Sequence, residues 1–139
     1  MLSIETARRL RDAGLEWKPE EGDRFAVPGT VLQDRIFIIN EMAAMLEMFR
    51  GFPVITFHGT PEWALDYIHL GETVWLPYEG QLRNRLASRL AERGAFVYDL
   101  LFADGVFTCR FESDGEGLAF AAEDAEEAYA TALLHLMEH

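Results

Sequence analysis

The chain has one cysteine, Cys109, and its thiol is the first group that could act as a nucleophile. A reactive cysteine needs a partly open, electropositive setting, and four histidines are available as bases. Cys109 alternates with Phe107 and Phe111, so it shares the inward face of an expected strand. We therefore expect a buried, unreactive thiol and no catalytic residue.

A second candidate set contains acids and histidines. Glu62, Asp66 and His69 follow one another at intervals of four and three, which places them on one side of an expected helix, and His58 precedes that helix. They could assemble a metal site or the acid and base groups of a weak hydrolase. This helix carries no His-x-x-x-His pair and the chain has no cysteine cluster. We expect a solvated helix face, with no metal and no cofactor.

A third set gathers aromatic and histidine side chains near the ends of the middle strands. Its members are Trp17, His58, Trp63, Tyr67, Trp75 and Tyr78. Their polar tips need hydrogen-bond partners when buried, so the set suits a pocket rim or an interface as well as a core. All but Trp17 enter our candidate recognition surface, with core filling as the alternative.

The net charge of −12 is concentrated at one end of the chain. Residues 112–139 hold eight aspartates and glutamates and no lysine or arginine. Such a surface repels phosphate backbones, so we expect no nucleic-acid partner, whereas a basic protein would be attracted. Glu112, Asp114 and Glu116 therefore complete the candidate recognition surface. The alternative is that the charge only keeps the protein soluble.

Arginines gather on the expected helix over residues 79–93. Arg83, Arg85 and Arg89 flank its leucine stripe and could bind phosphate. Surface arginines more often pair with neighbouring acids such as Glu92 or stay solvated, and this is what we expect here.

The elements that must position these residues are clearest in the last third of the chain. Every second side chain is apolar in three short runs, which predicts three strands over residues 96–102, 107–111 and 118–120. Asp104-Gly105 marks a hairpin turn. After Ala122 the apolar period becomes helical, and Asp124 is the expected N-cap of a helix that covers the strands.

Glycines punctuate the rest of the chain. We expect helices over residues 3–13, 41–50, 61–70 and 79–93, which end at Gly14, Gly51, Gly71 and Gly94. We expect strands over residues 24–27, 35–39, 54–57 and 72–77. In the second helix, methionines and Phe49 at helical spacing would form the buried face.

Length and composition favour one domain. The chain has 139 residues, half of them apolar, which is enough for one core. A single cysteine allows no internal disulfide, and no run is typical of a membrane span or a signal peptide. We expect a cytoplasmic protein without a membrane partner.

Three runs of the sequence carry a further resemblance, namely "PVITFHGTPEWALDYI", "VWLPYEGQL" and "ARRLRDAGLEWKPEEGDRFAVP". They resemble a family of small bacterial proteins that have no established activity, some of which carry a pilus-assembly label. The resemblance covers most of the chain and implies a fold family and a bacterial origin, but it transfers no functional residue. Pilus-localisation ATPases need a glycine-rich loop that ends in Gly-Lys-Ser or Gly-Lys-Thr, and Lys18 is the one lysine here.

Two further resemblances concern topology alone. The order helix, three strands, helix from residue 79 onward is similar to that of double-stranded-RNA-binding domains. That family places lysines at the start of its second helix, where this chain has Glu123, Asp124, Glu126 and Glu127. The strand-turn-strand segment with its acidic, alanine-rich helix is also similar to the antidote half of HicB-type antitoxins.

Together these patterns predict a single α+β domain over residues 1–139, with a mainly antiparallel sheet, helices packed on it and a C-terminal α-β-β-β-α unit. The leading functional hypothesis is a non-enzymatic protein-binding or regulatory module with an unknown protein partner, basic in character if the acidic face is the contact. A homo-oligomer is compatible with the sequence. The alternative is a small-molecule-binding protein or weak hydrolase that uses the region from His58 to Tyr78.

Overall fold

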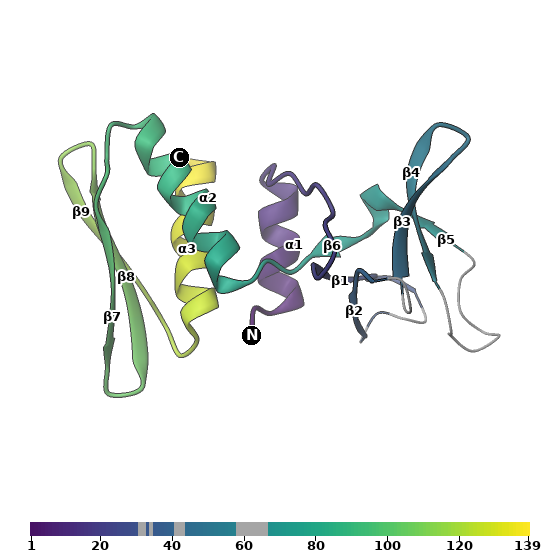
Figure 1. Ribbon diagram of the computed structural model, residues 1–139. Helices are drawn as coiled ribbons and strands as arrows, with labels where there is room; N and C mark the ends of the chain where they lie inside the picture. The colour runs from purple at the N-terminus through teal and green to yellow at the C-terminus, as the bar shows by residue number, and fades with distance from the viewer. Residues whose placement is uncertain (31–32, 34, 41–43, 58–66) are drawn as a thin grey trace. The chain divides into compact units, whose positions relative to one another are not determined.

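The computed structural model describes residues 1–30, 33, 35–40, 44–57 and 67–139. These residues form an α+β protein with three α-helices and three small sheets, and every strand pairing among them is antiparallel (Figure 1). The chain divides into two compact units, residues 1–15 with 77–139 and residues 16–76.

The first unit contains the predicted C-terminal arrangement. Its elements are α1 (Ile4–Asp12), α2 (Glu79–Glu92), β7 (Tyr98–Ala103), β8 (Val106–Ser113), β9 (Glu116–Ala122) and α3 (Ala125–Glu138). The sheet has the order β7-β8-β9, and α3 packs against β8 and β9 and also contacts α1 and α2 (Figure 1). The predicted α-β-β-β-α unit is therefore confirmed.

Two tight hairpins set the register of this sheet. Asp104 and Gly105 both have left-handed backbone angles, with φ of 50° and 79°, and Asp114 and Gly115 repeat this at 54° and 78°. Turns with two left-handed residues match the twist of the strands they join. Ala103 consequently pairs with Val106 at the first turn.

The core of the first unit lies under α3. Leu133 and Leu136 of α3 are buried, as are Leu82, Leu86 and Leu90 of α2. Their spacing of three and four residues is the stripe expected of helices that cover one layer. Both helices have the buried faces that the sequence predicts.

Helix α1 begins and ends as expected. The Ser3 hydroxyl accepts a hydrogen bond from the Thr6 N–H at 3.1 Å, which caps the start of the helix. Gly14 has a φ of 104°, and the Leu15 N–H returns to the Leu10 carbonyl at 3.0 Å. This is a glycine-terminated helix end.

The second unit consists of two three-stranded sheets. Its elements are β1 (Arg24–Ala26), β2 (Ile36–Ile38), β3 (Ala44–Phe49), β4 (Phe52–Phe57), β5 (Tyr67–His69), the 3-10 turn η1 (Leu70–Glu72) and β6 (Val74–Trp75). The strand orders are β2-β1-β6 and β3-β4-β5. Phe25, Phe37, Ile55 and Ile68 belong to the buried cluster of this unit. The predicted strands at residues 24–27, 35–39, 54–57 and 72–77 are confirmed, with shifted ends.

The helix predicted over residues 41–50 is wrong where the structure describes it. Residues Ala44–Phe49 form β3, which pairs with β4 along its whole length. Arg50 and Gly51, with φ of 52° and 85°, form the hairpin turn between the two strands, so Gly51 does not terminate a helix. Strand pairing with the apolar β4 outweighs the helical spacing of a short apolar run.

The helix predicted over residues 61–70 falls mainly on residues 58–66, which lie outside the described part of the chain. Its C-terminal end is wrong, because Tyr67–His69 forms β5 and pairs with β4. Gly71 lies within η1 rather than at the end of an α-helix. Of the four predicted glycine stops, Gly14 and Gly94 are confirmed as helix ends, each with a positive φ.

Candidate functional site

Cys109 is fully buried on β8, the central strand of its sheet. Burial raises the pKa of its thiol to about 11, with a smaller contribution from the negative charge of Asp99. The thiol is therefore protonated at neutral pH and has no access to solvent. The predicted burial of this cysteine is confirmed.

The predicted set of acids and histidines cannot be assembled from the described residues. His58, Glu62 and Asp66 lie outside them, and His69 is exposed on β5. The His69 ring meets the edges of the Tyr67 and Phe52 rings at 5.9 and 6.2 Å. Within the described ranges, no group of three or more histidine, cysteine, aspartate or glutamate side chains could hold a metal ion.

A His-x-x-x-His pair exists elsewhere and was overlooked by the sequence reasoning. His135 and His139 lie one turn apart at the end of α3, with their rings stacked at 4.3 Å. His135 also contacts the ring of Phe120 on β9 at 5.2 Å. Nearly parallel stacked rings do not direct two nitrogens at one metal ion, so the pair packs as an aromatic contact.

Trp75 belongs to the core of the second unit. It is 8% exposed and stacks on Trp17, with 6.3 Å between ring centroids and 6° between planes. The Trp17 indole N–H donates to the Asp23 carboxylate at 2.9 Å, and that carboxylate also accepts the Glu20 N–H at 3.0 Å. For Trp75 the core alternative of the sequence analysis is therefore correct.

The remaining aromatic members of the predicted surface belong to different units of the chain or lie outside the described residues. Tyr67 is exposed on β5, where its ring lies 4.9 Å from that of Phe49. Tyr78 is the N-cap of α2 and belongs to the other unit of the chain. His58 and Trp63 lie outside the described residues.

Asp124 has a structural task at the start of α3. Its carboxylate accepts hydrogen bonds from the N–H groups of Glu126 at 2.8 Å and Glu127 at 3.3 Å. The Met1 amino group also bonds to it, and this contact is the largest cause of the lowered pKa of Asp124. The predicted N-cap is confirmed.

The next two acids of α3 cap the other helices of the first unit. Glu126 accepts the Leu2 N–H at 2.7 Å and, with its second oxygen, the Glu79 N–H at the start of α2 at 3.1 Å. Glu127 accepts the Ser3 N–H at 2.6 Å at the start of α1. Carboxylates suit helix N-termini, where N–H groups lack partners within the helix. The three acids of this turn, Asp124, Glu126 and Glu127, therefore serve to join the three helices.

The acids of the β8–β9 hairpin have a different setting. Glu112, Asp114 and Glu116 are all exposed. Glu112 and Asp114 line an open groove of about 740 Å³, whereas Glu116 does not. Phe96 and Val97, which precede β7, line the same groove, so it combines carboxylates with apolar side chains.

Inside the groove, Arg110 of β8 donates to both carboxylate oxygens of Asp99 on β7, at 2.8 Å each. This hydrogen bonding lowers the pKa of Asp99. Gly117 of β9 lies opposite Glu112 and leaves open space where a side chain would point. On the outward face of the sheet, Asp99 and Arg110 are thus paired with each other, and no side chain fills the space beside Gly117.

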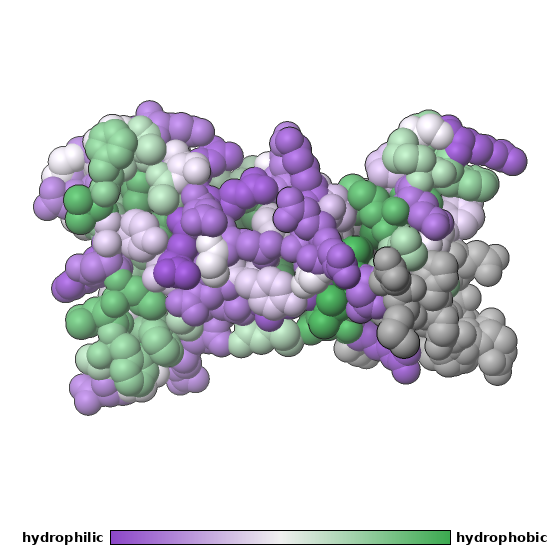
Figure 2. Space-filling view, viewed as in Figure 1, coloured by the Kyte–Doolittle hydropathy of each residue, from purple (hydrophilic) through white to green (hydrophobic). Residues whose placement is uncertain are grey.

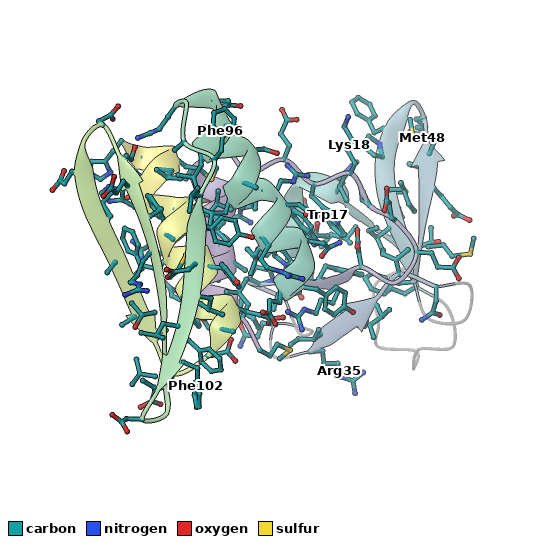
Figure 3. The ribbon with its side chains drawn as sticks, turned by 60° about the vertical axis from the view of Figure 1, so that its left-hand side comes forward. Trp17, Lys18, Arg35, Met48, Phe96 and Phe102 are labelled. Carbon is teal, nitrogen blue, oxygen red and sulfur yellow. The ribbon has the colours of Figure 1, made fainter. Side chains whose placement is uncertain are left out.

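Large apolar side chains are exposed along β7 and just before it. Their exposed fractions are 80% for Phe96, 79% for Val97, 47% for Leu101 and 59% for Phe102. Figure 2 shows hydrophobic residues gathered at both ends of this sheet, and Figure 3 shows Phe96 and Phe102 at opposite ends of β7. The sequence reasoning missed this surface. The available signal was that Val97 and Leu101 are apolar although they are out of phase with the inward-facing residues.

Comparison with protein-family models, with curated proteins and with solved structures found no match for this chain. Among the described residues, no helix is both long and apolar enough to cross a membrane.

Proposed function

We propose that this protein is a non-enzymatic binding or regulatory module that takes a basic, partly apolar segment of another protein in the groove of its C-terminal sheet. The observation that carries the proposal is that one open groove is lined both by the carboxylates of Glu112 and Asp114 and by the apolar side chains of Phe96 and Val97. Exposed apolar groups next to charges of one sign are typical of protein-interaction surfaces.

The chemistry of the groove supports binding more than catalysis. Asp99 and Arg110 neutralise each other, and Arg93 opposes the charge of Glu112 and Asp114, so the lining of the groove carries one more acid than arginine. No cysteine or histidine is among the described residues that line it. A lysine or arginine of the partner would reach the two carboxylates while its apolar neighbours cover the ring of Phe96.

The test uses short peptides in which leucine or phenylalanine alternates with arginine, and the same peptides with glutamate in place of arginine. Fluorescence anisotropy with the whole protein should show binding of the basic series alone, and that binding should weaken as salt is raised. Glu112→Gln and Asp114→Asn should each weaken it by several-fold. Glu116→Gln is the matched control, because Glu116 carries the same charge outside the groove.

A second variant separates the groove from the charge. Gly117→Leu places a side chain in open space, and the φ of Gly117 is not in the left-handed region, so the fold should tolerate the change. We expect this variant to block peptide binding without a change in net charge. Equal binding of both peptide series, or of duplex RNA in place of the peptides, would refute the proposal.

A further inference from the structure

Strand β7 is an edge of its sheet with unused hydrogen-bonding groups. Among the described residues it has β8 as its one neighbouring strand. Ala103 and Val106 flank a two-residue turn, a position at which paired residues exchange both main-chain hydrogen bonds. Because this pattern alternates along the strand, Leu101 and Asp99 also direct their main-chain N–H and C=O groups at β8. Tyr98, Leu100 and Phe102 then direct their N–H and C=O groups at the open edge.

The surroundings of this edge are apolar on both faces of the sheet. Val97 and Leu101 are exposed on the outward face of the sheet. Phe96 and Phe102 occupy positions that alternate with these and belong to the opposite face, and they are exposed as well. A second groove, of about 340 Å³, runs between β7 and α2, where Ala87 and other small side chains leave room. A strand added to β7 would therefore find apolar contacts above and below the sheet.

Charge distinguishes this edge from the other edge of the same sheet. Strand β9 begins at Glu116 and is followed by Glu123, and charged residues protect an edge from pairing. Residues 83–111, by contrast, hold five arginines and three acids, a balance of +2 in a chain of −12. The one acid of β7, Asp99, is paired with Arg110, so the β7 edge lies in a part of the first unit without an excess of negative charge.

We propose that β7 pairs antiparallel with β7 of a second copy of the chain, about a twofold axis at Asp99, and so forms a continuous six-stranded sheet. In this register Phe96 faces Phe102 of the other copy, and Val97 faces Leu101. All four exposed apolar residues of the segment are covered at once. The pairing extends beyond the proposed peptide-binding function, with which it would compete for Phe96 and Val97.

The hydrogen-bonding pattern and the apolar residues select this register together. Tyr98 meets Leu100 of the other copy as a hydrogen-bonded pair, since both direct their main chain at the open edge. A shift that centred the pairing on Leu100 would keep the hydrogen bonds but place Phe96 opposite Asp104. In the chosen register the two Asp99 carboxylates face each other, and each is already neutralised by its own Arg110.

The size of the contact predicts a weak, reversible dimer. At about 200 Å² for an aromatic side chain, the two phenylalanines alone cover on the order of 280 Å² per copy. With Val97, Leu101 and the strand backbones, the contact comes near the lower end of specific interfaces, about 1,200 Å² over both copies. Because each copy carries a charge of −12, added salt should strengthen the dimer by screening the repulsion.

The register is tested by a cysteine in place of one residue at a time. Residues at a non-hydrogen-bonded antiparallel pair have Cα atoms about 4.5 Å apart, which is within reach of a disulfide. Asp99→Cys should therefore form a covalent dimer under mild oxidation. Leu101→Cys is the matched control on the same face, since its two copies would lie about 14 Å apart. The unaltered protein, with only the buried Cys109, is the blank.

Sedimentation velocity tests the association itself. The unaltered protein should shift from monomer to dimer as concentration rises from micromolar to millimolar, and further at higher salt. Leu101→Lys should weaken the dimer about tenfold or more, because lysine blocks an edge strand. Val106→Lys, an exposed position on β8, should leave it unchanged. A monomer at every concentration and salt level, open-ended aggregation, or equal cross-linking of the two cysteine variants would overturn the proposal.

Discussion

The sheets β3-β4-β5 and β7-β8-β9 are built alike but differ in the cover of their second face. In each, a two-residue turn with left-handed angles joins the first two strands. In the first sheet, Val54 is 1% exposed on the face where the rings of Phe49 and Tyr67 approach to 4.9 Å. In the second, the middle-strand residues Arg110 and Glu112 are exposed on the face away from α3.

This difference shows that hairpin turns fix which strands pair, whereas the size of the outward side chains decides whether a face is closed. Two rings from the flanking strands cover the middle strand of the first sheet. The second sheet has Ala119 and Ala121 on the flanking strand β9, and alanines cannot cover a neighbour. Its outward face is therefore left open.

The largest expected effect is on the covered face of the second sheet. Leu133 of α3 is fully buried, so Leu133→Ala should lower the free energy of unfolding by about 2–5 kcal/mol. The measurement is the urea midpoint at constant slope. Thr131→Ala, at an exposed position of the same helix, should change stability by less than about 0.5 kcal/mol. An unchanged midpoint for Leu133→Ala would mean that α3 does not cover the sheet.

A matched pair of truncations tests the comparison directly. Val54→Ala should cost about 2 kcal/mol, because it removes buried methyl groups from under two rings. Leu101→Ala removes more carbon but from an exposed position, and should cost less than about 0.5 kcal/mol in the monomer. Thermal or urea unfolding of the two variants at low protein concentration shows which of them loses more stability. A larger loss for Leu101→Ala would show that the outward face of β7-β8-β9 is covered.

A smaller effect is expected from the cap of the covering helix. Asp124→Ala should lower the free energy of unfolding by about 1 kcal/mol, the usual value of an N-cap. Asp124→Asn keeps a hydrogen-bond acceptor at the N-cap and should lower the free energy of unfolding by less. Equal stability of all three proteins in urea would mean that the cap contributes nothing.

The pH dependence of this cap follows from the lowered pKa of Asp124. A depressed folded-state pKa contributes stability that is present above the ordinary aspartate value, about 3.9, and is lost as the pH falls through the folded-state value. The difference between the unaltered protein and Asp124→Ala should thus be constant at neutral pH and shrink below about pH 4. A difference that persists at pH 2 would assign the effect to the neutral side chain.

The last third of the fold could be predicted because local signals agree there. Alternation, Asp-Gly turns and the Asp124 cap all indicate the same elements, and the structure confirms them. The helix predicted over residues Ala44–Phe49 was wrong because their apolar positions suit a helix and a strand equally well. The deciding interaction, pairing with β4, depends on a partner strand and on the Arg50-Gly51 turn, whose sequence is an uncommon one for this turn type.

The candidate site was predictable only in part. Glu112 and Asp114 were selected from charge alone and do line a groove, while Trp75 was selected as an aromatic and is core. The edge at Phe96 was missed because apolar alternation predicts a buried face wherever it occurs. Whether a helix reaches far enough to cover an edge strand depends on the packing of α2 and α3, which no local pattern encodes.

The carboxylates that join the three helices also impose an order on folding. The hydrogen bonds from Leu2 to Glu126 and from Ser3 to Glu127 each connect residues 124 positions apart. Ser3 caps α1 locally, but during synthesis the Leu2 and Ser3 N–H groups have no carboxylate acceptor until the first turn of α3 has left the ribosome. The second unit, residues 16–76, is contiguous and can form earlier. Closure of the first unit is thus a late, non-local event, which slows folding relative to a chain of the same size with local contacts.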